Sequence, residues 1–142
     1  MINLLTGINS TAAALDAERV RMDVISQNIA NVNTTRGPDG KPYQRQQVVF
    51  ASVLRARQAG ETVAPQQVQI ARIEKDTRPA RQVYMPGHPD ADPHGMVAVP
   101  DINIHEEMAD MISASRSYEA NLAVAKNAHS MAMAALSIGK HS

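Results

Sequence analysis

The sequence predicts an α+β protein in which two long terminal helices flank a small β-rich centre. All eight prolines lie between Pro38 and Pro100, and five of the seven glycines lie within 36–100, so helix-breaking residues are confined to the middle of the chain. Apolar residues recur at helical spacing on both sides of that middle. The 142 residues therefore divide into an N-terminal helix in 1–35, a β-rich central segment with loops in 36–100, and a C-terminal helix in 101–142.

The N-terminal segment predicts one helix, from about Leu4 to Asn31. Apolar residues stand there at every seventh position, which gives the narrow stripe by which a helix packs against a partner. These positions are candidate assembly contacts: Ile8, Leu15, Met22 and Ile29.

The centre predicts about four short strands, at 43–54, 67–73, 82–85 and 96–99. Enrichment in β-branched residues and partial alternation mark these runs. A loop rich in Gly and Pro at 60–65 separates the first two, and the run from Pro86 to Gly95 separates the last two. The centre has few apolar residues, so we expect the helices or neighbouring subunits to support it.

The C-terminal segment predicts a second long helix, with Asp101 as its N-cap and Gly139 just past its end. Its seam alternates spacings of four and three residues. The seam positions are Ile104, Met108, Met111, Ser115, Tyr118, Leu122, Ala125, His129, Ala132 and Leu136. Such a pattern shows that a helix packs but not against which partner, so packing within one subunit and packing between subunits both stay open.

Composition excludes several classes of function. There is no Cys, which removes disulfides, thiolate nucleophiles and Cys-ligated zinc. Fourteen basic residues balance fourteen acidic ones, which argues against a nucleic-acid-binding protein. The apolar runs are too short for a membrane span, and no basic stretch followed by an apolar one marks a cleavable secretion signal.

One loop carries metal-ligand chemistry. His88, Asp90, Asp92 and His94 alternate along the chain, and on an extended strand they would share one face. Prolines interrupt the run and glycines bracket it, which is typical of a surface loop. No hydrolase or nucleotide-binding motif accompanies it. We therefore expect no metal, no cofactor and no enzyme, and keep a small metal-binding enzyme as an alternative.

Polar residues stand near the ends of the predicted helices. The run SQNIANVNT, residues 26–34, holds Asn28, Asn31 and Asn33, and asparagine favours helix ends over helix interiors. The run SRSYEANL, residues 115–122, mixes small residues, which permit close helix approach, with side chains able to bond between chains. Those side chains include Arg116, Tyr118 and Asn121.

These two runs resemble the signatures of the bacterial flagellar rod and hook family of axial proteins. The run YMPGHPDAD at 84–92, with Glu106 and Glu107 beyond it, is similar to the proximal-rod members of that family. The resemblance covers essentially the whole chain. A cytoplasmic helical adaptor unrelated to flagella is the second alternative.

The resemblance implies a structural protein of the basal-body rod, which spans the periplasm and transmits torque. It implies export by the flagellar type III apparatus without a cleaved signal peptide. It also implies homo- and hetero-oligomeric assembly with copies of itself, other rod proteins and the adaptor that joins the rod to the MS ring. The expected assembly interface is Ile8, Leu15, Met22, Asn28, Ile29, Asn31, Asn33, Met108, Met111, Arg116, Tyr118, Asn121, Leu122 and Leu136.

Overall fold

A computed structural model describes residues 2–54 and 66–139 of the chain. Its elements, in chain order, are α1 (Ile2–Ala30), β1 (Gln46–Leu54), β2 (Gln66–Lys75), β3 (Arg81–Tyr84), β4 (Met96–Val99) and α2 (Ile104–Gly139). The predicted α+β class, with a long helix on each side of a small β-rich centre, is confirmed. The predicted Gly/Pro loop at 60–65 lies outside the described residues.

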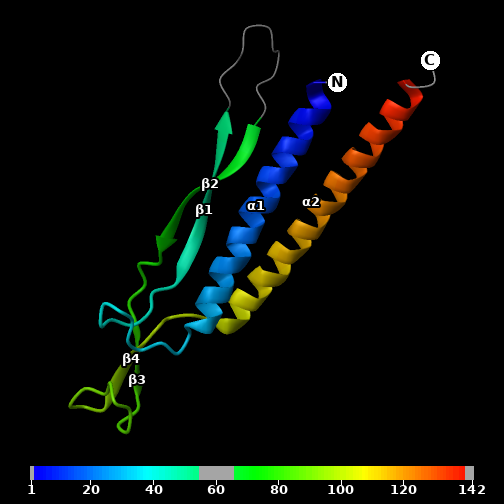
Figure 1. The fold of residues 1–142 in the computed structure, drawn as a ribbon. Coiled ribbons are helices and arrows are strands. Elements are labelled where there is room, and N and C mark those ends of the chain that lie inside the picture. The colour runs from blue at the N-terminus through cyan, green and yellow to red at the C-terminus, as the bar shows by residue number, and fades with distance from the viewer. Residues whose placement is uncertain (1, 55–65, 140–142) are drawn as a thin grey trace.

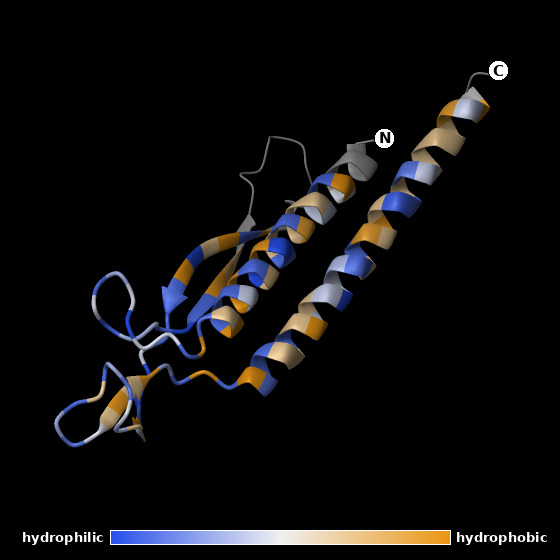
Figure 2. Ribbon diagram, turned by 60° about the horizontal axis from the view of Figure 1, so that its bottom comes forward, coloured by the Kyte–Doolittle hydropathy of each residue, from blue (hydrophilic) through white to orange (hydrophobic). Residues whose placement is uncertain are grey.

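The two helices lie side by side and run antiparallel, so that both ends of the chain are found at the same end of the molecule (Figure 1). Helix α1 lies between α2 and the hairpin formed by β1 and β2, and it has backbone neighbours in all three. Among the described elements, α2 has close backbone neighbours in α1 alone. Figure 2 shows apolar residues recurring along both helices, and the C-terminal turns of α2 reaching beyond the start of α1.

The sheet region consists of two separate antiparallel hairpins rather than one four-stranded unit. In the longer hairpin Gln46 pairs with Lys75 and Leu54 with Gln66, with a bulge between Val49 and Phe50. In the shorter hairpin Arg81 pairs with Val99. All four predicted strands are present, but β1 begins three residues later than predicted, because the residues before it form the junction described below.

Helix α2 begins at Ile104, so the prediction that Asp101 is its N-cap was wrong. Asn103 caps the helix instead, since its side-chain oxygen accepts a hydrogen bond from the backbone N–H of His105 at 3.0 Å. Between the two, Ile102 is buried, which holds the chain extended past Asp101. Asparagine and aspartate cap helices equally well, so residue type did not distinguish the two positions. The range of α2 includes Gly139, which was expected just past its end.

The face of α2 that meets α1 is made of small and polar residues. Eight of the buried or half-buried positions again alternate spacings of four and three: Glu107, Met111, Ala114, Tyr118, Asn121, Ala125, Ala128 and Ala132, with Asp110, Ser115 and Ser117 half-buried beside them. This register shares Met111, Tyr118, Ala125 and Ala132 with the predicted seam. The larger apolar members of that seam, such as Leu122 and Leu136, are exposed on the flanks of the helix.

Candidate functional site

The C-terminal turns of α1 meet the start of β1 and the first turn of α2 at a buried polar junction. Its centre is Asn28, whose side chain is fully buried. The amide Nδ2 donates hydrogen bonds to the backbone oxygen of Gln46 at 2.8 Å and to Oε2 of Glu107 at 3.0 Å. Its Oδ1 accepts from the backbone N–H of Gln46 at 2.9 Å and from the Tyr43 hydroxyl at 3.0 Å. All four bonding positions of the amide are therefore filled.

Glu107 is the second buried member of the junction, with no exposed surface. Its Oε1 accepts a hydrogen bond from Nε of Arg45 at 2.6 Å, and its Oε2 accepts the bond from Asn28. A buried carboxylate is costly unless it is paired and hydrogen-bonded. Both oxygens of Glu107 meet that condition through partners that come from two different parts of the chain.

Further ion pairs extend from the junction. Arg45 lies 3.9 Å from Asp76 and 3.9 Å from Asp110, and Arg78 lies 2.8 Å from Asp76. Hydrogen bonds from Arg78 hold the pKa of Asp76 below its usual value, and those same bonds raise the pKa of Arg78. Burial, and then the negative charge of Glu107, raises the pKa of Tyr43. The turn after β2 is thus tied to the base of the helix pair.

The loop with alternating His and Asp residues uses its carboxylates for local structure. Asp90 accepts a hydrogen bond from the Thr35 hydroxyl at 2.9 Å and pairs with Arg36 at 2.8 Å. Asp92 accepts bonds from the backbone N–H groups of His94 and Met96. Within residues 2–54 and 66–139, no three His, Asp or Glu side chains are grouped as a metal site would need.

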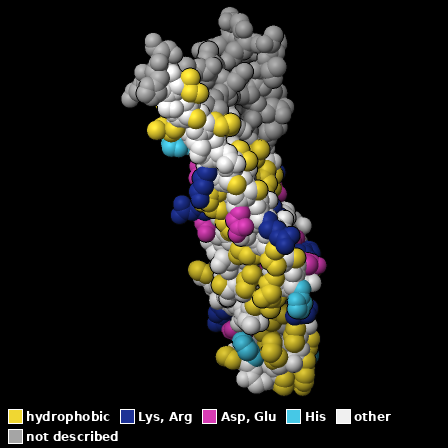
Figure 3. Space-filling view, turned by 90° about the vertical axis from the view of Figure 1, so that its right-hand side faces the viewer, with side chains coloured by type: hydrophobic (Ala, Val, Ile, Leu, Met, Phe, Trp, Pro, Cys, Tyr) yellow, Lys and Arg dark blue, Asp and Glu magenta, His cyan; other side chains and the backbone are white. Residues whose placement is uncertain are grey.

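The outer surface of α2 carries most of the large exposed apolar side chains of the described residues. They are Ile104, Met108, Ile112, Leu122, Val124, Met131, Met133, Leu136 and Ile138. With 3.6 residues per turn they lie on more than one side of the helix, and we call them together the apolar face of α2. Figure 3 shows hydrophobic side chains spread along the long axis of the molecule on this side, with charged groups interspersed. Exposed apolar patches on proteins commonly mark contacts with other proteins, so these side chains are the candidate contact surface of the chain.

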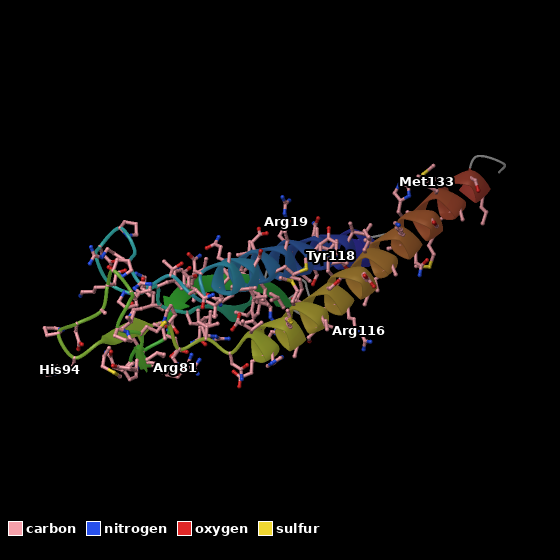
Figure 4. The ribbon with its side chains drawn as sticks, turned by 90° about the horizontal axis from the view of Figure 1, so that it is seen from below. Arg19, Arg81, His94, Arg116, Tyr118 and Met133 are labelled. Carbon is pink, nitrogen blue, oxygen red and sulfur yellow. The ribbon has the colours of Figure 1, made fainter. Side chains whose placement is uncertain are left out.

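The residues expected at the assembly interface fall into three groups in the structure. Asn33, Met108, Arg116, Leu122 and Leu136 are exposed. Ile8, Leu15, Met22, Ile29, Asn31, Met111, Tyr118 and Asn121 are half-buried. Asn28 alone is fully buried and bonded within the chain. In Figure 4 Arg116 projects away from α1, whereas Tyr118 lies between the two helices.

Three members of the junction, Tyr43, Arg45 and Glu107, did not emerge from the sequence as site residues. An acidic first turn is favourable at the start of a helix, and this accounts equally for Glu107 and for its exposed neighbour Glu106. Nothing in the local sequence therefore marked Glu107 as one of the two fully buried positions of α2, the other being Ala114.

Neither helix, over the residues that the structure describes, is apolar enough along its length to span a membrane.

Known proteins match both ends of the chain and nearly its whole length. The family described as "Flagella basal body rod protein" matches residues 8–38, and the one described as "Flagellar basal body rod FlgEFG protein C-terminal" matches residues 94–138. The flagellar basal-body rod protein FlgC of Borreliella burgdorferi is 44% identical, with 96% of this chain and 98% of that protein covered.

Two further relatives are similar over a comparable length. FlgC of Bacillus subtilis is 39% identical over 94% of this chain and 96% of its own. FlgC of Yersinia enterocolitica is 38% identical over 98% of this chain and 100% of its own. The chain therefore belongs to the FlgC family of flagellar basal-body rod proteins, and it is a structural component of the flagellar basal body.

Proposed function

We propose that the protein is a subunit of the proximal rod, the periplasm-spanning drive shaft that transmits torque in the flagellum, and that it catalyses no reaction. The observation that carries the proposal is the apolar face of α2. One side of this 36-residue helix packs on α1, while large apolar side chains project from the rest of its surface. Contact with neighbouring subunits would remove that surface from water.

The helices in 1–35 and 101–142 are the axial parts of the subunit, and 36–100 forms the part outside them. The exposed members of the interface are Asn33, Met108, Arg116, Leu122 and Leu136. The half-buried members, such as Met111 and Tyr118, border the same surface. A head-to-tail contact whose rotation does not close produces an open helical assembly, as a tubular rod requires.

The partners are copies of this chain, other rod proteins and the adaptor between the rod and the MS ring. The chain reaches them through the flagellar type III apparatus, without removal of a signal peptide. The support for these finer points is the resemblance of SQNIANVNT and SRSYEANL to the axial family. Torque then passes through many small interfaces rather than through one large one.

The substitution Leu122→Asp tests this assignment. Leu122 keeps 36% of its surface exposed in the single chain, so the change is tolerated within the subunit. In an assembled interface it would bury an unpaired charge in every copy. The variant is expressed in cells lacking the native protein, and swimming and periplasmic accumulation are scored. We expect export without motility.

Ser130→Asp is the matched control, because it adds the same charge to the same helix at a position that is already polar and exposed. We expect it to preserve most of the motility. Swimming cells with Leu122→Asp would refute the role of the apolar face in assembly. Retention of that variant in the cytoplasm would refute the separation of export from assembly.

A further inference from the structure

We propose that Asn28 and Glu107, with Tyr43, Arg45 and Gln46, form a latch that fixes the β1–β2 hairpin at a set orientation to the helix pair. In this view Asn28 is a positioning residue inside the subunit rather than a contact between subunits. The inference concerns the single chain and stands apart from the assignment to the rod.

The first link of the latch joins α1 to β1. The Asn28 side chain bonds both the N–H and the C=O of Gln46, at 2.9 and 2.8 Å. This is the pair of bonds that a neighbouring strand would supply to an edge residue. Asn28 therefore attaches the first residue of β1 directly to α1, and the Tyr43 hydroxyl strengthens the link from the same segment at 3.0 Å.

The second and third links join both of these elements to α2. Asn28 bonds Glu107 across 79 positions of sequence, and Glu107 bonds Arg45, the residue next to Gln46. The three links close a triangle between the end of α1, the start of β1 and the first turn of α2. A closed triangle of short bonds leaves no free hinge between the three elements.

The latch matters because no described backbone of α2 lies close to that of β1 or β2, so the hairpin and α2 are linked through α1 and through these side-chain bonds. The hairpin extends away from the junction along α1 (Figure 1). Its nine-residue strand β1 is about 30 Å long. At that length a change of about 10° at the base moves the far end by about 5 Å. Packing against α1 supports the hairpin along its length, and the bonds of the latch set the angle at its base relative to α2.

Distances between two spin labels test the proposal, because the chain has no Cys and accepts labelled cysteines at chosen positions. Gln69 in β2 and Glu119 in α2 are both exposed and are replaced by Cys in the full-length chain. Pulsed electron paramagnetic resonance then gives the distribution of distances between the hairpin and α2. In the otherwise unchanged chain we expect one narrow distribution.

Two variants open the latch. Glu107 accepts hydrogen bonds on two side-chain oxygens, whereas the glutamine in Glu107→Gln has only one. The bond from Asn28 or the bond from Arg45 is therefore lost. Asn28→Asp removes both donors of the amide and places a carboxylate against Glu107. We expect the width of the distance distribution to at least double in each variant, with the helical signal in circular dichroism retained.

The double variant Asn28→Asp with Glu107→Gln is a rescue test. The new amide at 107 can accept from Arg45 and donate to the carboxylate at 28, so the distribution narrows relative to Asn28→Asp alone. Asn31→Asp is the matched control, since Asn31 belongs to the same motif but bonds only nearby groups, the Gln27 carbonyl and the Thr34 hydroxyl. We expect it to leave the distribution unchanged.

Four results would overturn the latch. One is a broad distribution in the unsubstituted chain. Another is a distance distribution that stays narrow in Glu107→Gln. That result alone is sufficient if Asn28→Asp loses its helical signal in circular dichroism and cannot be used. The third is a distance distribution that broadens in Asn31→Asp as much as it does in the latch variants. The fourth is a distance distribution in the double variant that is as broad as the one in Asn28→Asp. All four measurements use a purified chain and do not depend on whether it assembles into a rod.

Discussion

Among the residues that the structure describes, two glycines adopt the left-handed backbone conformation, in different surroundings. Gly95 has φ of 75° and Gly40 has φ of 73°. A Cβ added to Gly95 would lie 2.9 Å from Cε2 of Tyr84 and 3.1 Å from Cβ of Pro86, whereas one added to Gly40 would meet nothing within 4 Å. Alanine at Gly40 would therefore cost free energy through the backbone conformation alone, whereas alanine at Gly95 would add steric crowding of its Cβ.

We predict that Gly95→Ala lowers the free energy of unfolding more than Gly40→Ala does. Gly40→Ala carries only the conformational cost of about 1–2 kcal/mol. Gly95→Ala adds overpacking against the ring, about 1–3 kcal/mol. Urea unfolding followed by circular dichroism measures both. Equal losses in the two variants would show that the β3–β4 loop relaxes around a side chain.

Asp76 makes stability depend on acid. Its pKa is lowered in the folded chain, first by hydrogen bonds from Arg78. The unfolded chain therefore binds a proton at a higher pH than the folded chain does, and the stabilisation present above about pH 4 is lost as the pH falls through the lowered pKa. We predict that Asp76→Asn destabilises the chain at pH 7 and flattens the loss of stability below about pH 4.

The measurement is the unfolding midpoint in urea at a series of pH values. Asp16→Asn, which changes an exposed carboxylate of α1, is the control. We expect it to leave the slope with pH as it is in the unchanged chain. If the urea midpoint changes with pH by the same slope in Asp76→Asn as in the unchanged chain, Asp76 does not contribute to the loss of stability in acid.

At the scale of single residues, the sequence pointed to the asparagines at the end of the first helix but not to the residues with which they form hydrogen bonds. The asparagines at the end of the first helix were recognised from their poor fit to a helix interior. The partners of Asn28 lie at 43–46 and 107, and no local pattern connects those positions. The junction depends on how the end of α1, the start of β1 and the first turn of α2 come together, which only the folded structure shows.

At the scale of elements, both helices and all four strands were predictable because their signals are local. Helical periodicity and β-branched runs need only the neighbouring sequence. The pairing of four strands into two separate hairpins is a non-local result and was not predicted. The predicted seam of α2 followed its larger apolar residues, whereas the inner face uses small ones such as Ala114, so hydrophobicity alone selected a partly different register.

The inner face of α2 weakens with distance from the junction. Near the junction it is held by Glu107 and by the buried Ala114, whereas farther along it consists of the half-buried alanines 125, 128 and 132. We predict that amide hydrogen exchange in the purified full chain is slow over about 107–118 and much faster beyond Leu122.

Pulse-labelling with mass spectrometry of peptic fragments measures this gradient, and β4, with its buried Val97 and Val99, serves as a protected reference. In the proposed assembly the faster turns would gain most from cover by neighbouring subunits, which would couple the folding of this region to assembly. Uniform strong protection along α2 would show instead that the pair with α1 is stable throughout on its own.

At the scale of the whole molecule, the sequence predicted the order of helix, strands and helix, and the two motif runs identified the axial family. It left open whether the two helices pack against each other or against other subunits. The structure shows that α2 packs against α1 with one side and keeps large apolar side chains exposed on the rest of its surface. The first alternative is therefore realised within the chain, and exposed apolar surface is left on α2 for the second.

Because the two helices differ in length, the two ends of the subunit along the helix axis are different. Helix α2 has 36 residues and α1 has 29, a difference of about two turns, or about 10 Å. At the junction end the helices are held together by buried bonds, while at the opposite end α2 reaches beyond the first described turn of α1 (Figure 2). The two ends of a subunit therefore offer different surfaces to whatever lies above and below it. Subunits stacked along their helices would give a filament with two chemically distinct tips, so that addition of the next subunit at one tip is a different reaction from addition at the other.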